Sequence, residues 1–141
     1  MAQPVALFVF IPFCKIKCTY CDFNVYAHLS RLMKPYADAV AQEIQKSEIR
    51  NQKSELVARS VYFGGGTPSL MPTASIEKIL RAFHDAFFFL PNPEITLEAN
   101  PGNIDVDTRS VRALRSLGVN RLSLGVQSFD DATLRRLNRG H

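Results

Sequence analysis

All three cysteines of the chain lie in one short stretch, with the spacing C-x3-C-x2-C at Cys14, Cys18 and Cys21. The apolar run at residues 6–11 comes just before them and predicts a buried strand that carries the thiols onto one loop. Three thiolates on one loop are suitable ligands for a metal ion or an iron–sulfur cluster. Since a closed site usually takes four protein ligands, a [4Fe–4S] cluster held here would keep one iron open.

Two other kinds of site compete with the cluster. A structural zinc site would take the same cysteines with His28 as its fourth ligand, although such ligands usually come in two separated pairs. A disulfide is disfavoured because the cysteine count is odd and no secretory signal comes before it. The spacing alone therefore leaves a cluster and a zinc site open.

Composition limits the class of protein. A length of 141 residues allows at most one domain, and an apolar fraction of 46% is enough for a globular core. No apolar run is long enough for a transmembrane segment, and the N-terminus has no secretory pattern. Clustered thiols without a secretion signal indicate a reducing compartment, the cytoplasm or an organelle matrix. The net charge of +4 is scattered, which favours a solvated surface over nucleic-acid binding.

Apolar periodicity and turn residues predict alternating strands and helices. Four helices are expected. The first runs from about Arg31 or Pro35 to about Gln52, and the second runs from a cap at Thr73 or Ser75 to a stop at Pro91. The third runs from Asp105 or Asp107 to Gly118, and the fourth begins after Ser128, Asp130 and Asp131. Four strands are expected at residues 6–11, 60–63, 94–99 and 119–124, and residues 55–59 read as a polar link.

This order predicts an α/β fold, a parallel sheet with right-handed crossovers. Four such strands are either a small open sheet or the first half of a barrel. Because the sequence stops soon after the fourth helix, we expect a fragment of something longer.

The unusual residues all follow strands. The cysteines follow the first strand, Gly64-Gly65-Gly66-Thr67-Pro68 follows the second, Glu98 and Asn100 end the third, and Gln127 follows the fourth. In parallel α/β folds these strand ends meet at one rim, where ligands bind. The sequence therefore predicts a ligand site that all four segments share.

The glycines at positions 64–66 exceed what a tight turn needs, and we expect them to offer bare N–H and C=O groups to a ligand. The lysine of a phosphate-binding loop is absent. Glu98 either faces water or accepts hydrogen bonds in the site, and Gln127 can both donate and accept. Arg139 reads as a surface cation or as the partner of a ligand carboxylate.

Together these motifs resemble those of the radical S-adenosylmethionine superfamily, and within it the oxygen-independent coproporphyrinogen III oxidase-like family. The similarity rests on Ile11-Pro12-Phe13-Cys14 with the cysteine loop, on the stretches at 63–69 and 94–101, and on Gly118 to Phe129, and it covers nearly the whole chain. It implies the N-terminal half of a partial (β/α)6 barrel with parallel strands and outer helices. Residues 1–141 would form an incomplete core domain, cut after the fourth β/α unit.

The resemblance also implies the roles of individual residues. Cys14, Cys18 and Cys21 would hold a [4Fe–4S] cluster whose open iron takes the amino and carboxylate groups of S-adenosylmethionine. Reductive cleavage of that ligand gives methionine and a 5′-deoxyadenosyl radical in this superfamily. The remaining contacts to S-adenosylmethionine would come from Tyr20 beside the adenine, from Gly65, Gly66 and Thr67 at the methionine end, and from Glu98, Gln127 and Arg139.

Three positions depart from the family pattern. Phe8 and Phe10 stand where the family usually has tyrosine and histidine, and the lost hydroxyl removes one polar contact, typically about 1 kcal/mol. Phe23 stands where the coproporphyrinogen dehydrogenases have a fourth cysteine. The chain therefore resembles the haem-chaperone branch, which implies haem or porphyrin as cargo or substrate and an electron donor protein. A coproporphyrinogen III dehydrogenase and a zinc-stabilised binding module remain the alternatives, and no haem ligand is evident.

Overall fold

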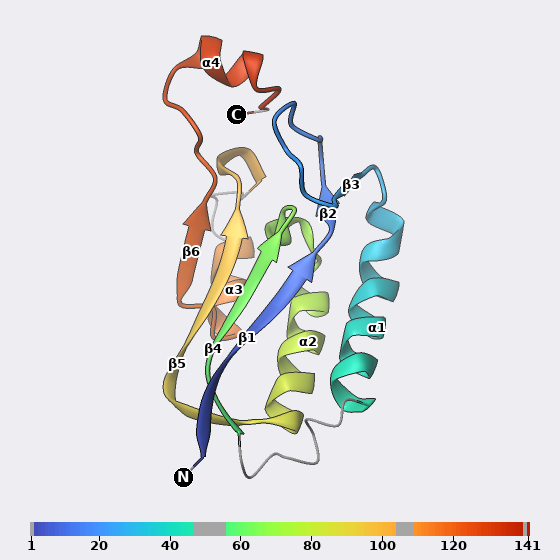
Figure 1. Ribbon diagram of the computed structural model, residues 1–141, viewed down its shortest axis with the longest axis vertical. Coiled ribbons are helices and arrows are strands. Elements are labelled where there is room, and N and C mark those ends of the chain that lie inside the picture. The colour runs from blue at the N-terminus through green and yellow to red at the C-terminus, as the bar shows by residue number, and fades with distance from the viewer. Residues whose placement is uncertain (1, 47–55, 104–108, 140) are drawn as a thin grey trace.

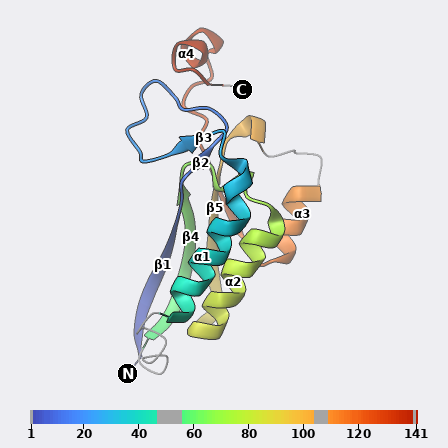
Figure 2. The same cartoon turned by 90° about the vertical axis from the view of Figure 1, so that its right-hand side faces the viewer.

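The computed structural model describes residues 2–46, 56–103, 109–139 and 141, and only the backbone of residues 103, 109 and 110. Four strands form one parallel sheet in the order β1-β4-β5-β6, with bounds β1 (Gln3–Ile11), β4 (Leu56–Gly65), β5 (Phe88–Ala99) and β6 (Arg121–Leu124). The helices α1 (Met33–Lys46), α2 (Thr73–Ala86) and α3 (Arg109–Ser116) all lie on one side of this sheet (Figure 1, Figure 2). The predicted α/β architecture of parallel strands with outer helices is confirmed.

Side-chain alternation along the strands explains why the helices cover one face only. In β1, Val9 and Ile11 are buried, whereas Phe8 and Phe10, which alternate with them, are exposed. In β4, Val61 and Phe63 are fully buried under the helices. Successive strand residues point to opposite faces, so the apolar set packs against the helices while the other set lines an uncovered face.

The helix α2 supplies the predicted apolar stripe to this core. Ile76, Ile79, Leu80 and Phe83 are all buried at helical spacing, as their sequence pattern indicates. Each of these side chains removes an apolar area worth about 1.5–3 kcal/mol when fully buried. The helix layer therefore fixes the sheet from one side and leaves the strand ends free to build a site.

Smaller elements shape the upper end of the sheet. They are β2 (Phe13–Cys14), β3 (Tyr26–Ala27), the short 3-10 helices η1 (Ser30–Leu32), η3 (Pro68–Leu70) and η4 (Pro101–Asn103), and the helix α4 (Asp131–Arg136). The β2–β3 pair, which the sequence did not predict, joins the two ends of the cysteine loop. The same loop touches the α4 region, because Asn138 Nδ2 donates to the Lys17 carbonyl at 3.2 Å. Figure 1 shows α4 above the strand ends, beside this loop.

Several predicted element boundaries are wrong. The strand β1 begins at Gln3 instead of residue 6, and β6 begins at Arg121 instead of residue 119. The helix α2 ends at Ala86 instead of running to Pro91, and the chain enters β5 at Phe88. Aromatic residues such as Phe88 favour strands, and the Pro91-Asn92-Pro93 segment forms an irregularity inside β5, where Asn92 has a φ of 54°. Residues 56–59, expected to be a link, belong to β4.

The helix ends show where local signals decide the structure. Gly118 has the predicted left-handed φ of 97°, and Val119 N–H donates to the Leu114 carbonyl across it. Asp130 caps α4 through a 2.7 Å bond from Thr133 N–H. The predicted side-chain cap of α2 is wrong, because that helix begins at Thr73 directly after Pro72 without one. The predicted end of the first helix near Gln52 and the start of the third near Asp105 lie outside the described residues.

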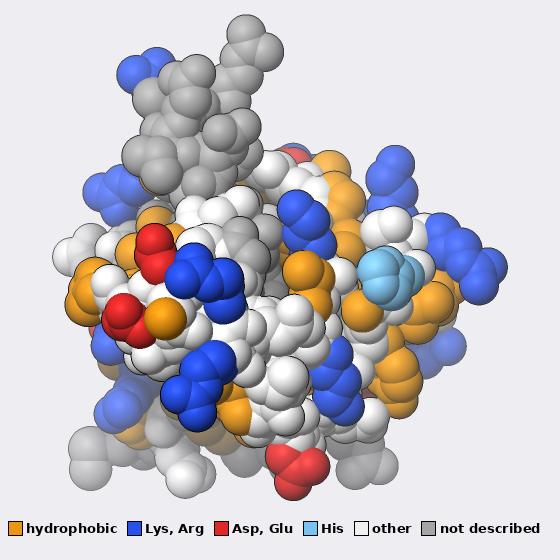
Figure 3. Space-filling model, turned by 90° about the horizontal axis from the view of Figure 1, so that it is seen from above, with side chains coloured by type: hydrophobic (Ala, Val, Ile, Leu, Met, Phe, Trp, Pro, Cys, Tyr) orange, Lys and Arg blue, Asp and Glu red, His pale blue; other side chains and the backbone are white. Residues whose placement is uncertain are grey.

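Within the described part of the chain, no helix combines the length and the apolar character that crossing a membrane requires. Viewed from above, the molecule shows Lys and Arg side chains spread among polar and apolar ones (Figure 3). This distribution matches the scattered charge of the sequence.

Candidate functional site

A pocket of about 310 Å³ opens at the carboxyl ends of the four strands. Its lining includes all ten residues that the sequence analysis singled out, namely Cys14, Cys18, Tyr20, Cys21, Gly65, Gly66, Thr67, Glu98, Gln127 and Arg139. They come from the cysteine loop, the glycine turn, the end of β5 and the segment after β6. The parallel sheet therefore brings together residues that are up to 125 positions apart in the printed numbering, from Cys14 to Arg139.

The three thiols are free and half-buried in this pocket. Cys14 Sγ lies 3.7 Å from Thr67 Oγ1, and Arg139 Nη1 donates to Cys18 Sγ at 3.3 Å. Burial raises the pKa of Cys14, and the neighbouring Cys21 and Cys18 add to that rise. A bound cation would reverse this balance, because coordination to a metal deprotonates a thiol.

As placed, however, the thiols do not form a ready-made metal site. Among the described residues, no three His, Cys, Asp or Glu side chains are close enough together to hold a metal ion. The thiols as they lie are therefore not arranged around a single metal ion. His28, the fourth ligand of the alternative zinc site, is exposed and is not part of the pocket lining.

The glycine turn packs tightly against the end of β1. Gly65 has a φ of 113°, and a Cβ on Gly66 would lie 2.6 Å from the Phe13 carbonyl oxygen. The expectation of bare N–H groups is wrong here, because Gly66 N–H donates to Ile11 and Thr67 N–H donates to Phe13, each at 2.7 Å. A ligand at this turn would therefore meet backbone carbonyl groups, which suit an amino group.

Glu98 points into the pocket and is held there by two donors. Tyr62 Oη donates to Glu98 Oε1 at 2.7 Å, and Gly65 N–H donates to Oε2 at 3.0 Å. The bond to Glu98 is the main cause of the raised pKa of Tyr62, since it stabilises the neutral phenol. Sequence reasoning missed Tyr62, whose only signal was its place two residues before the glycines.

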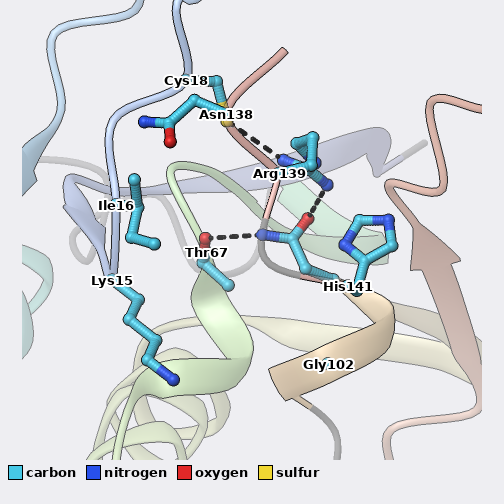
Figure 4. A pocket seen from close by; sticks show the side chains of 9 residues that line it. Lys15, Ile16, Cys18, Thr67, Gly102, Asn138, Arg139 and His141 are labelled. Carbon is cyan, nitrogen blue, oxygen red and sulfur yellow. Dashed lines mark hydrogen bonds between the residues drawn. The ribbon is translucent and has the colours of Figure 1, made fainter. Parts of the chain in front are cut away.

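Arg139 reaches back from beyond α4 into the pocket, so it is not a plain surface cation. Its Nη2 donates to Asn100 Oδ1 at 2.7 Å and also contacts the Gly125 carbonyl. Its Nε is buried and has no hydrogen-bond partner among the described residues. Figure 4, a view of an adjoining cavity that Cys18, Thr67 and Arg139 also line, shows the bond from Arg139 to Cys18 as a dashed line. An unpartnered buried N–H of a cation is a position where a ligand oxygen would be favoured.

Two residues complete the wall of the pocket. Gln127 has a φ of 65°, and a left-handed conformation of a non-glycine residue often marks a ligand-binding segment. Tyr20 lines the pocket and is 48% exposed. Both positions suit contacts at the edge of a bound molecule.

The donor set fits an iron–sulfur cluster with an adjoining amino-acid ligand. Three soft thiols share the pocket with a carboxylate at Glu98, a guanidinium at Arg139 and the glycine carbonyls. A molecule with an amino group, a carboxylate and a flat ring would find a partner for each of them here.

Comparison with known proteins shows the family of the chain. Residues 8–141 match the Radical SAM superfamily. The chain is 39% identical to a protein of Haemophilus influenzae named heme chaperone HemW, covering 98% of this chain and 36% of that protein. It is 37% identical to a protein of Bradyrhizobium diazoefficiens named oxygen-independent coproporphyrinogen III oxidase, covering 95% of this chain and 29% of that protein.

A solved structure of Escherichia coli coproporphyrinogen III oxidase (HemN), described as a radical SAM enzyme, superposes with a TM-score of 0.87 at 30% identity. The match covers 99% of this chain and 32% of that one. The chain thus spans about a third of the length of the proteins that it matches. With the sequence match, the shared fold and the thiol-lined pocket at the strand ends all in agreement, the chain belongs to the radical SAM superfamily.

Proposed function

We propose that the chain binds a [4Fe–4S] cluster through Cys14, Cys18 and Cys21 and binds S-adenosylmethionine beside it. The superfamily implies both groups. The observation that carries the proposal is the single pocket that collects all three thiols and all seven of the other predicted contact residues. Three cysteine ligands leave one iron of a cubane cluster for an external ligand.

Different residues of the chain would contact different groups of S-adenosylmethionine. Arg139 would donate to the carboxylate, and the glycine-turn carbonyls would accept from the amino group. Glu98 accepts from ribose hydroxyls, while Tyr20 and Gln127 bound the adenine end. When bound and reduced, the cluster supplies the electron that cleaves the sulfonium C–S bond. The cysteine loop and the segment after β6 then keep water away from that bond.

For the whole protein, we propose the role of a haem chaperone. Phe23 lines the pocket at the position where the dehydrogenase resemblance expects a fourth cysteine, and a phenyl ring cannot ligate metal. The relatives from Haemophilus influenzae and Escherichia coli carry the name heme chaperone HemW. A relative at similar identity is named an oxygen-independent coproporphyrinogen III oxidase, so oxidative decarboxylation of that porphyrinogen is the second candidate.

The proposal includes an electron donor protein, because a radical SAM site needs a one-electron reductant. We also propose that the protein itself acts in the cytoplasm, since clustered free thiols persist in a reducing compartment.

Activity assays on the complete protein separate the two candidates. The reconstituted protein is incubated anaerobically with haem and, separately, with coproporphyrinogen III, S-adenosylmethionine and dithionite. The proposal expects stoichiometric haem binding in the absorption spectrum and no decarboxylated porphyrinogen by mass spectrometry. Conversion of the porphyrinogen without retention of haem would favour the dehydrogenase.

A further inference from the structure

We propose that Asn100 is a positioning residue that fixes Arg139 and Thr67 around the ligand site, an inference that rests on the proposed function. Asn100 stands at the end of β5, where its amide lies between the glycine turn and the segment after α4. Its Nδ2 donates to Thr67 Oγ1 at 3.2 Å, and its Oδ1 accepts from Arg139 Nη2 at 2.7 Å. One side chain therefore connects two of the predicted ligand contacts.

The chemistry of the partners fixes the orientation of this amide. A guanidinium only donates, so the Asn100 oxygen must face Arg139 and the nitrogen must face the Thr67 hydroxyl. The hydroxyl then accepts from Asn100 and keeps its own proton for Cys14 Sγ, 3.7 Å away. A residue with a single polar function at position 100 could not serve both partners in this way.

The same chain of bonds reaches two of the three thiols. From Asn100 it passes through Thr67 to Cys14, and through Arg139 Nη1 to Cys18 Sγ at 3.3 Å. The dashed lines of Figure 4 follow it from Thr67 toward Arg139 and on to Cys18. The end of β5, a rigid strand, is thus linked to the cysteine loop by side chains alone.

The backbone leaves room for this arrangement at Gly125. A Cβ at Gly125 would lie 2.8 Å from Asn100 Oδ1 and 3.2 Å from Arg139 Nη2. Any larger residue would push the two side chains apart. The contact between Asn100 and Arg139 therefore depends on the absence of a side chain at Gly125, and Gly125→Ala offers a second way to disturb this contact.

Positioning matters because a free arginine side chain has many rotamers. Ordering it when a ligand binds would reduce affinity, whereas an arginine held in advance avoids that loss. Arg139 is held by Cys18, Asn100 and the Gly125 carbonyl, and its Nε is buried without a hydrogen-bond partner among the described residues. Without the Asn100 side chain, the Arg139 guanidinium loses its hydrogen bond to the end of β5.

The sheet offers a matched control at its opposite end. Asn120 also uses both ends of its amide, accepting from Ile95 N–H and donating to the Pro93 carbonyl, each at 2.9 Å. It lies at the start of β6, away from the pocket. Asn100→Ala and Asn120→Ala thus remove the same group and the same number of bonds, and differ in whether those bonds support Arg139.

The test compares these variants in the complete protein with two readouts. In the cluster-free protein, NMR follows the Arg139 side-chain N–H signals, identified as those lost in Arg139→Lys. They are expected to exchange slowly in wild type and Asn120→Ala and rapidly in Asn100→Ala. In the reconstituted protein, Asn100→Ala is expected to weaken S-adenosylmethionine binding about tenfold by calorimetry. It is also expected to make the cluster potential more negative, because Cys18 loses its cationic donor.

A double-mutant cycle shows whether Asn100 acts through Arg139. Asn100→Ala should add little to the affinity loss of Arg139→Ala, since both remove the same arrangement. Asn100→Asp keeps the acceptor for Arg139 and should restore most of the affinity. Should Asn100→Ala fail to fold, Gly125→Ala replaces it as the variant that disturbs the contact between Asn100 and Arg139.

Slow Arg139 exchange in Asn100→Ala, or equal affinity and potential in the Asn100→Ala and Asn120→Ala proteins, would overturn the inference. A wild-type protein that takes up no cluster or S-adenosylmethionine would refute the proposed function instead. The NMR readout would then still decide whether Asn100 positions Arg139.

Discussion

Individual side chains of this site are held by hydrogen bonds from neighbouring residues, and Glu98 is the simplest example. Its carboxylate shares a strand with apolar residues, where a carboxylate without partners would be costly. Tyr62 and Gly65 each satisfy one of its oxygens. The remaining lone pairs face the pocket, so Glu98 can accept from a ligand without moving.

Tyr62→Phe tests this support. The variant keeps the ring that stacks on Phe8 at 5.9 Å and removes only the hydroxyl. We expect a loss of about 1 kcal/mol in the free energy of unfolding, measured by denaturant titration, and severalfold weaker S-adenosylmethionine binding. The exposed Tyr26→Phe is the control, and equal effects in the two variants would contradict the role of Tyr62.

The same bond predicts a pH dependence. The pKa of Tyr62 is raised because its hydrogen bond to Glu98 favours the neutral phenol. A raised folded-state pKa means that the stabilisation is fully present below the ordinary tyrosine pKa of about 10. It is lost as the pH rises through the raised value. The difference in melting temperature between wild type and Tyr62→Phe should therefore shrink in strongly alkaline solution, and a difference that grows there would contradict this assignment.

Some of these site residues could be predicted from the sequence and others could not. Cysteine spacing and the glycine run are local patterns, so Cys14, Cys18, Cys21 and Gly65 stood out without a structure. Tyr62 does not carry such a pattern, because its partner Glu98 lies 36 positions away on the neighbouring strand. Long-range hydrogen bonds of this kind become visible only when the sheet register is known.

At the scale of elements, the glycine turn joins β4 to the end of β1 without space for side chains. Gly66→Ala would bring a Cβ to 2.6 Å and 2.9 Å from the carbonyl oxygens of Phe13 and Ile11. These atoms belong to the backbone, so the strand ends must separate. We expect the variant to lose cluster uptake, measured as iron and sulfide content, together with a lower melting temperature.

Gly118→Ala separates damage to the site from general destabilisation. Gly118 has a φ of 97°, but a Cβ there would meet nothing closer than Ile95 at 3.4 Å. The left-handed conformation should cost about 1–2 kcal/mol of stability while cluster uptake stays at the wild-type level. Loss of the cluster in both variants would show that the turn has no special role.

Element order was predictable and some boundaries were not. The period of apolar residues located the four strands and the buried face of α2, because burial imposes that period. Pro91 was expected to stop a helix, yet the helix ends at Ala86 and the proline sits in β5. Here the pairing of Phe88 and Phe89 with β4 decides the structure, and a single sequence does not show that pairing.

For the molecule as a whole, one face of the sheet carries apolar side chains without a helix over it in the described part of the chain. Phe8 and Phe10 of β1 are exposed on this face, and the helices α1–α3 lie on the other side of the sheet (Figure 2). Apolar area of this kind is usually covered by another part of a protein.

We therefore expect the 141-residue chain on its own to bind a hydrophobic dye such as ANS. Phe8→Lys and Phe10→Lys should lower the dye fluorescence and slow aggregation, because they place charge on the uncovered face. Leu32→Lys, a partly exposed leucine of η1, is the control and should change neither signal. Dye binding that is insensitive to the first two variants would contradict this expectation.

The central claim is that three thiols hold a cluster with an iron left open for S-adenosylmethionine. The direct measurement is the EPR spectrum of the anaerobically reconstituted, dithionite-reduced complete protein, before and after S-adenosylmethionine is added. We predict about four irons per chain and a spectrum that changes on addition, with both features lost in Cys14→Ser. A colourless protein that binds one tight zinc, or a cluster whose spectrum ignores S-adenosylmethionine, would contradict the claim.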